Sequence, residues 1–261
     1  MLAINKKNIV LGAVALLLLA ACKKADLRII EYNLPKDKAF ARFVLLSPGT
    51  PAVMIKVNDA KINGGFTTGS LGIFPTSSIA ADYAAIESNS TFRLSLANTG
   101  TANDSVLIFS GKLGIEAGKN YTVLLADTAA DRTVFALEDV LPARPDSGYM
   151  NIRFVNAMAK TEPLSLIRVD SASATVVTRD TIIKNIAFKQ ASNFVRVPIS
   201  SNNAFLRYRM IISATGMQIG STLTPTTSSF LNYRSGTIYA GGFGNGTLTT
   251  SPFLFGIHIN K

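Results

Sequence analysis

Apolar and polar residues alternate in several short stretches after residue 38, a pattern typical of half-buried β-strands. Residues 92–96 (FRLSL) place three apolar side chains on one face, and residues 204–210 (AFLRYRM) and 253–259 (FLFGIHI) repeat the pattern. Turn-forming residues separate such runs, and beyond residue 22 no stretch of a dozen residues keeps a helical period. The pattern therefore predicts an all-β protein built from β-sandwiches.

Short segments recur in the same order and at nearly the same separation, which indicates an internal duplication. Four segments recur: residues 42–44 as 153–155, 56–58 as 168–170, 83–96 as 194–208 and 121–123 as 236–238. Residues 142–148 (PARPDSG) lie between the copies and hold two prolines and a glycine, which is typical of a linker. We therefore predict two tandem antiparallel β-sandwich domains, at residues 39–141 and 149–261.

The first 22 residues have the parts of an export signal. Lys6 and Lys7 precede an apolar run that ends at Leu19. This run is about half of the roughly 20 residues that a membrane-spanning helix needs, and small residues follow it. We therefore expect residues 1–21 to be a cleaved signal peptide and residues 22–38 to be a tether in front of the first domain.

The end of this signal, Leu19-Ala20-Ala21-Cys22, resembles the lipobox of bacterial lipoproteins, where a peptidase cuts before a Cys that already carries diacylglycerol. The resemblance implies lipid attachment at Cys22, the only Cys in the chain. An ordinary signal peptide followed by a chance Cys is the alternative. Lys23 stands directly after Cys22, and by resemblance to Gram-negative sorting rules this permits export to the outer membrane. Periplasm-facing and cell-surface orientations both stay open.

Residues 42–58 (RFVLLSPGTPAVMIKVN) resemble the opening motif of domain-of-unknown-function family 4397, found in secreted and lipid-anchored bacterial proteins, often in tandem. The likeness covers nearly all of residues 39–141 and, more faintly, residues 148–240. It implies an Ig-like β-sandwich for each domain and no particular reaction, because the family carries no established activity. The histidine of the family motif is Leu45 here and Asn156 in the second copy. A polar site at that position in relatives would therefore be incomplete in this chain.

The excess of basic over acidic residues lies in the second predicted domain, because acidic residues are few there. The whole chain has 26 Lys and Arg against 16 Asp and Glu, a net charge of +10. Residues 22–147 hold 13 basic and 13 acidic side chains, whereas residues 148–261 hold 11 basic and 3 acidic ones. The positive charge that is left after signal cleavage therefore belongs to the second domain.

Three arginines of that domain, Arg196, Arg207 and Arg209, are candidates for anion binding. Arg196 shares a predicted strand face with Phe194, and Arg207 and Arg209 share one with Phe205. If the two strands are neighbours, the guanidinium groups and aromatic rings would form an exposed patch. A solvated sheet face, whose arginines prevent edge-to-edge aggregation, is the alternative.

The inventory of reactive side chains argues against catalysis. A nucleophile normally needs a positioned His as its base, and the only His is His258, on the polar face of a predicted strand near the C-terminus. Glu138 and Asp139 are adjacent at a predicted strand end, so we interpret them as solvated residues on opposite faces. One Cys and one His cannot build a structural zinc site. We expect no enzyme activity, no metal and no cofactor.

Four Asp-Ser/Thr-apolar triplets resemble the O-glycosylation acceptor of Bacteroidetes envelope proteins. Their acceptor residues are Ser105, Thr128, Ser171 and Thr181. Asp followed by Ser or Thr is also favoured by turn chemistry, so a purely structural origin stays open.

These observations favour a lipid-anchored outer-membrane protein of Bacteroidetes type that acts as a non-enzymatic binding or structural module. Its expected partners are the membrane, through the lipid anchor, and an envelope protein or a glycan. The alternative function is binding of carbohydrate or an anionic polymer through the basic second domain. Nucleic acid is not an expected partner, because the predicted location is outside the cytoplasm and the basic patch is sparse.

Overall fold

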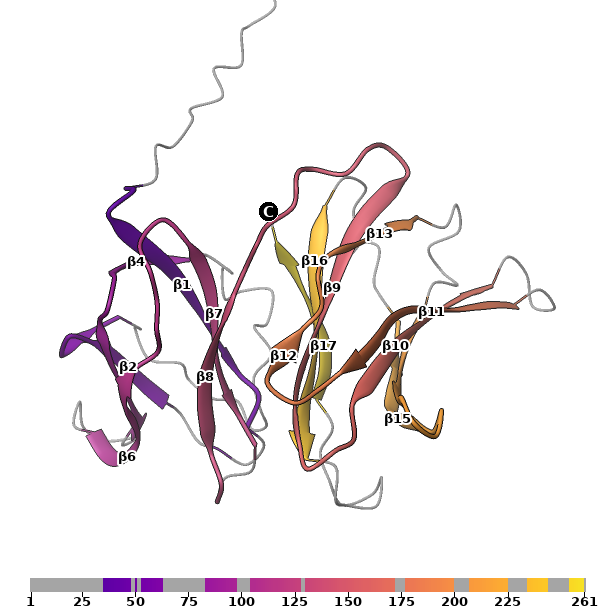
Figure 1. Cartoon of the computed structure of the whole chain (residues 1–261). Helices are drawn as coiled ribbons and strands as arrows, with labels where there is room; N and C mark the ends of the chain where they lie inside the picture. Colours follow the sequence, from indigo (N-terminus) through magenta and orange to yellow (C-terminus); the bar gives the residue numbers. More distant parts are fainter. Residues whose placement is uncertain are drawn as a thin grey trace, which may run out of the picture. The chain divides into compact units, whose positions relative to one another are not determined.

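In the computed structural model the chain is all-β: the described residues form seventeen strands and no helix (Figure 1). The structure describes residues 35–47, 50, 53–62, 83–97, 104–127, 130–171, 177–199, 207–224, 234–243 and 254–260. The strands form sheets that enclose shared apolar cores, as described below. The predicted all-β sandwich class is therefore confirmed.

The first half of the described chain, residues 35–141, holds two four-stranded sheets. One sheet has the order β4 (Ala84–Glu87), β1 (Lys38–Leu45), β7 (Asn120–Ala126) and β8 (Thr133–Glu138). The other has the order β3 (Ala60–Lys61), β2 (Val53–Val57), β5 (Thr91–Ala97) and β6 (Asp104–Lys112). The two sheets share one core, in which Ile55, Phe92 and Leu94 pack with Ala41 and Val123. Phe92 and Leu94 are the inward residues that the alternation predicts.

The second half, residues 149–260, is built in the same way. One sheet has the order β12 (Gln190–Ala191), β9 (Tyr149–Ala159), β16 (Ser235–Phe243) and β17 (Leu254–Asn260), with β13 (Val195–Pro198) also paired to β9. The other has the order β11 (Val177–Ile186), β10 (Leu164–Ser171), β14 (Arg207–Ile212) and β15 (Gln218–Leu223). Phe154 and Leu166 are buried with Tyr208 and Met210 in the core between these sheets.

The two halves repeat one strand order, and the recurring sequence segments lie on equivalent strands, such as residues 42–44 on β1 and 153–155 on β9. The pairings differ from a purely antiparallel arrangement at one place in each half. Strand β1 pairs in parallel with β7, and β9 pairs in parallel with β16. Parallel pairing needs a long crossover, and in each half the chain passes through the strands of the other sheet between the two parallel partners. The other described pairings are antiparallel.

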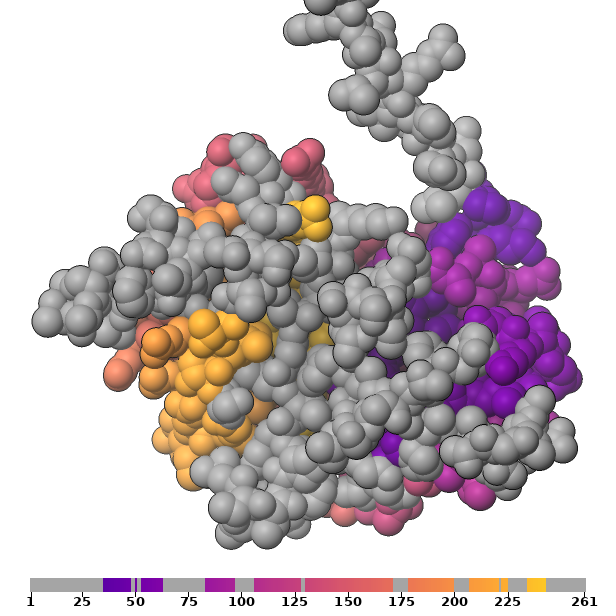
Figure 2. Space-filling view, turned by 180° about the vertical axis from the view of Figure 1, so that it is seen from behind, coloured from indigo at the N-terminus to yellow at the C-terminus, as the bar shows by residue number. Residues whose placement is uncertain are grey.

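An apolar layer joins the two halves, which belong to one compact unit. It consists of Val44, Leu46, Leu124 and Ala126 from the first half and Val155, Ala157 and Tyr239 from the second. Strand β9 is buried at every position after Tyr149. Alternate residues of a strand point to opposite faces, so one face of β9 fills its own core while the other, with Arg153 and Val155, packs on the first half. Seen from behind, indigo to magenta residues of the first half and salmon to yellow residues of the second half occupy different sides of the molecule (Figure 2).

Candidate functional site

A buried carboxylate lies where the two halves meet. Asp139 directly follows β8 and is 2% exposed. Its Oδ2 atom accepts a hydrogen bond from Thr122 Oγ1 at 2.6 Å and another from Tyr83 OH at 2.7 Å. Arg42 Nη2 lies 3.4 Å from the same oxygen, and Arg153 Nη1 donates to Oδ1. Both carboxylate oxygens therefore face donors, and these donors come from both halves.

The two arginines occupy equivalent positions of the duplication. Arg42 lies on β1 opposite Thr122 of β7, and Arg153 lies on β9 opposite Thr237 of β16. Each arginine is 4% exposed. Arg42 Nε donates to Thr122 Oγ1 at 2.7 Å, and Arg153 Nη2 donates to the backbone oxygen of Glu138 at 3.0 Å. We call Arg42, Arg153 and Asp139 the buried charge triad.

Each arginine of the buried charge triad lies near an aromatic ring. The guanidinium carbon of Arg42 lies 5.1 Å from the ring centroid of Tyr83, and that of Arg153 lies 5.9 Å from the ring of Phe194. Burial raises the pKa of Tyr83 and of Tyr239 above the ordinary tyrosine value, so both hydroxyls keep their protons at neutral pH. Tyr83 therefore acts as a hydrogen-bond donor to the carboxylate.

The structure corrects the interpretation of Asp139 as a solvated strand-end residue. Its neighbour Glu138 does point outward, where its carboxylate lies 3.1 Å from Lys119 Nζ. Asp139, on the opposite face, points into the contact between the halves. The two side chains therefore lie on opposite faces, as the alternation predicts, but the sequence offers no sign that the second half covers the face of Asp139. The recurrence of Arg42 as Arg153 was visible in the sequence, whereas the shared carboxylate was not.

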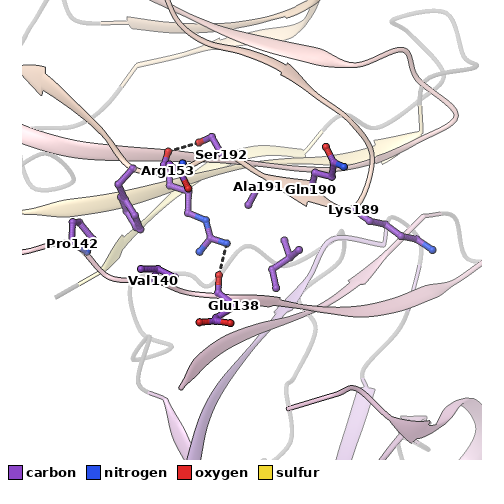
Figure 3. Close-up of a pocket in the computed structure, with 11 residues that line it drawn as sticks. Glu138, Val140, Pro142, Arg153, Lys189, Gln190, Ala191 and Ser192 are labelled. Atoms are coloured by element: carbon purple, nitrogen blue, oxygen red, sulfur yellow. Dashed lines mark hydrogen bonds between the residues drawn. The ribbon is translucent and has the colours of Figure 1, made fainter. Parts of the chain in front are cut away.

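A pocket of about 500 Å³ borders the triad on the side of Arg153 (Figure 3). Eleven residues line it: Leu137, Glu138, Val140, Pro142, Arg153, Lys189, Gln190, Ala191, Ser192, Asn193 and Phe194. They come from the end of β8, the segment that follows it, β9, and the segment around β12. Figure 3 shows the Arg153 guanidinium between these segments, with its hydrogen bond to Glu138.

The three arginines predicted to bind anions do not share one sheet. Arg196 lies on β13, which pairs with β9, whereas Arg207 and Arg209 lie on β14, which pairs with β10 and β15. The neighbouring strands that the hypothesis required are therefore not formed. Arg196 instead pairs with Asp146 at 2.8 Å and lies 3.8 Å over the ring centroid of Tyr149.

The remaining predicted residues are only partly described. Thr181 is exposed on β11, and Ser105 and Ser171 belong to β6 and β10. Thr128 and Cys22 lie outside the described residues, as do the predicted signal peptide and most of the tether. His258 lies on β17 opposite Thr237.

Within the described ranges, no three His, Cys, Asp or Glu side chains are grouped closely enough to hold a metal ion. A search of the same residues for a helix able to cross a membrane finds none.

Residues 39–167 match the sequence model of DUF4397, a domain of unknown function. This match supports the family resemblance of the first predicted domain. It extends past Leu141 through β9 and into β10. A search of curated proteins finds no match.

Proposed function

We propose that the chain is a lipid-anchored protein of the cell envelope whose two β-sandwiches act together as a non-enzymatic binding or structural module. The observation that carries this proposal is that the buried carboxylate of Asp139 binds residues of both halves. Its carboxylate accepts hydrogen bonds from Thr122 and Tyr83 and faces the guanidinium groups of Arg42 and Arg153. A carboxylate held in this way is committed to joining the two halves, and it is a poor candidate for proton transfer.

The buried charge triad favours a single rigid body. Taking a charged group out of water costs several kcal/mol unless partners compensate it. Asp139 lies in the first half and Arg153 in the second, so separating the halves would leave each without its partner. The apolar layer around Val44 and Val155 adds to this cost, because separation would expose it to water. The halves should therefore stay docked.

The anchor is proposed from the sequence. A lipidated Cys22 would hold the chain at the outer membrane, facing the periplasm or the cell surface, and the following residues would space the sandwiches from the bilayer. Attachment by more than one acyl chain is stable, because each buried methylene contributes about 0.8 kcal/mol. The partner would then be an envelope protein or a glycan.

Distance measurements between spin labels test the rigid module. Cys22 is the only Cys, so pairs of labels can be introduced in a Cys22→Ala background. Thr91 on β5 and Lys184 on β11 are exposed, so labels at these two residues measure a distance between the two halves. We expect one narrow distance distribution, which Asp139→Ala broadens. Labels at Lys61 and Lys112, both in the first half, are the control and should not change.

A broad Thr91–Lys184 distribution in the chain with native Asp139 would contradict the proposal. Loss of the narrow distribution for the control pair in Asp139→Ala would instead indicate unfolding of the first half.

A further inference from the structure

We infer that the pocket beside Arg153 binds a carboxylate-bearing ligand that also has an apolar face, such as a uronic acid residue of an acidic glycan. The inference rests on the proposed function as a binding module and assigns a site and a ligand class to it. The pocket volume of about 500 Å³ falls in the range of about 300–1,000 Å³ common for small-ligand sites.

The charge of the lining favours an anion. Arg153 and Lys189 contribute two positive charges and Glu138 one negative charge. The Glu138 carboxylate also lies 3.1 Å from Lys119 Nζ, which pairs with Glu116 at 2.9 Å as well, so Lys119 balances only part of the Glu138 charge outside the pocket. Behind the lining, Asp139 lies between Arg42 and Arg153. With Arg153 counted once, three cations (Arg42, Arg153 and Lys189) face two carboxylates (Glu138 and Asp139), which leaves one net positive charge. An anion in the pocket would reduce this excess.

Arg153 is a suitable donor for a carboxylate. Its hydrogen bonds to Asp139 and to the Glu138 backbone use two of its five N–H groups. The guanidinium is held by these bonds and by the neighbouring Phe194 ring, so little side-chain entropy is lost when it binds a ligand. A planar guanidinium matches the two oxygens of a carboxylate better than a point charge does.

The rest of the lining fits a ring with an apolar face and hydroxyl groups. Phe194, Pro142 and Val140 supply apolar surface, and Val140 is 72% exposed, which leaves its side chain free to contact a ligand. Gln190 and Asn193 are exposed and carry amide groups, which can both donate and accept hydrogen bonds. A sugar acid combines a carboxylate, an apolar ring face and hydroxyl groups, so it can use all three parts of the lining.

Isothermal titration of the full chain with oligogalacturonate tests the inference, with the methyl-esterified oligomer and inorganic phosphate as comparison probes. We expect saturable binding of the acid form, weaker binding at higher salt because of screening, and no saturable binding of the ester. Equal binding of acid and ester, or no saturable binding of the acid, would overturn the inference. Saturable binding of phosphate instead of the acid would also overturn it.

Two matched substitutions locate the site. Val140→Glu places a carboxylate at the pocket, and we expect it to weaken oligogalacturonate binding by on the order of tenfold or more, because like charges repel. Val106→Glu adds the same charge at a residue that is 50% exposed on β6, outside the lining, and should leave binding unchanged. Val140 is exposed, so neither change should prevent folding. Equal affinity of the two variants would overturn the assignment of the pocket.

The spin-label experiment separates this inference from the proposed function. If no probe binds while the distance between labels at Thr91 and Lys184 stays narrow, the assigned ligand class is wrong and the rigid module stands. If the distribution is broad, the module itself fails.

Discussion

Arg42 and Arg153 are 111 positions apart in the chain, occupy equivalent places in the two copies of the duplication, and face the same carboxylate. Each copy thus supplies one guanidinium to Asp139, which lies just after the last strand of the first copy. The same strand position in the two copies therefore contacts one carboxylate at the place where the copies meet.

Replacing the shared carboxylate should destabilise the protein strongly. Asp139→Asn keeps the shape of the side chain but leaves two buried guanidinium groups without their counter-ion, and breaking a buried ion pair in this way costs about 3–5 kcal/mol. We expect a loss of that size in the free energy of unfolding measured with urea. Asp131→Asn, which removes an exposed pair with Lys160, is the control, and should cost at most about 1 kcal/mol. Equal losses in both variants would contradict the role assigned to Asp139.

The two arginines should be coupled to Asp139 to different degrees. Arg153 donates a hydrogen bond to the carboxylate, whereas Arg42 approaches it at 3.4 Å and donates its Nε hydrogen bond to Thr122 instead. An arginine–carboxylate pair joined by a direct hydrogen bond is stronger than one that lies at 3.4 Å without such a bond. Double-mutant cycles that combine Asp139→Asn with Arg153→Met or with Arg42→Met should therefore give the larger coupling energy for Arg153. A larger coupling for Arg42 would contradict the geometry.

Much of the fold could be predicted from local patterns. Phe92 and Leu94 alternate with polar residues and are buried as the pattern predicts, and the segments that recur in sequence lie on equivalent strands. These features depend on residues that are close in sequence or on direct similarity between the copies. The parallel pairing of β1 with β7 depends on where the chain crosses between sheets, and alternation carries no information about that.

The buried charge triad shows why the site was harder to predict. A charged residue at a strand end is normally solvated, and Glu138 follows that rule. Asp139 differs only because the second half covers its side of the strand. The pocket likewise combines residues near 140, 153 and 190, which no sequence spacing brings together. The three basic residues grouped by sequence lie in two different sheets, because neighbours along the chain need not be neighbours in a sheet.

Thr181 provides the clearest test of the proposed glycosylation. It is exposed on β11, so a glycan there would not disturb the core. We expect Thr181→Ala to remove one glycan from the chain isolated from its native envelope, as measured by intact mass. Thr178→Ala is the matched control, because Thr178 is exposed on the same strand but does not follow an Asp. If the native chain and Thr181→Ala differ in mass only by the difference between Thr and Ala, Thr181 carries no glycan and the prediction is wrong.

Cys22 should determine membrane attachment. The native chain is expected to incorporate radiolabelled palmitate and to fractionate with membranes, and Cys22→Ala should lose the label and the membrane association. Lys23→Ala, next to the proposed attachment site, is the control and should keep the label. Labelling of the Cys22→Ala variant would contradict the proposed anchor.

Buried tyrosines should make the protein sensitive to alkali. Burial raises the pKa of Tyr83, Tyr208 and Tyr239 in the folded chain, while tyrosines of the unfolded chain ionise near about 10. Above that pH the unfolded chain releases protons that the folded chain keeps, so the free energy of unfolding falls as the pH rises. The limiting slope for each such tyrosine is about 1.4 kcal/mol per pH unit.

Urea unfolding at a series of alkaline pH values measures this slope. Tyr208→Phe removes one ionisable group from the core of the second half, so its free energy of unfolding should fall less steeply than that of the native chain above about pH 10. Below that range the two curves should run parallel, because the tyrosines are protonated in both states, and this region serves as the internal control. Equal slopes for the two proteins above pH 10 would show that Tyr208 ionises as readily in the folded chain as in the unfolded one, which would contradict its burial.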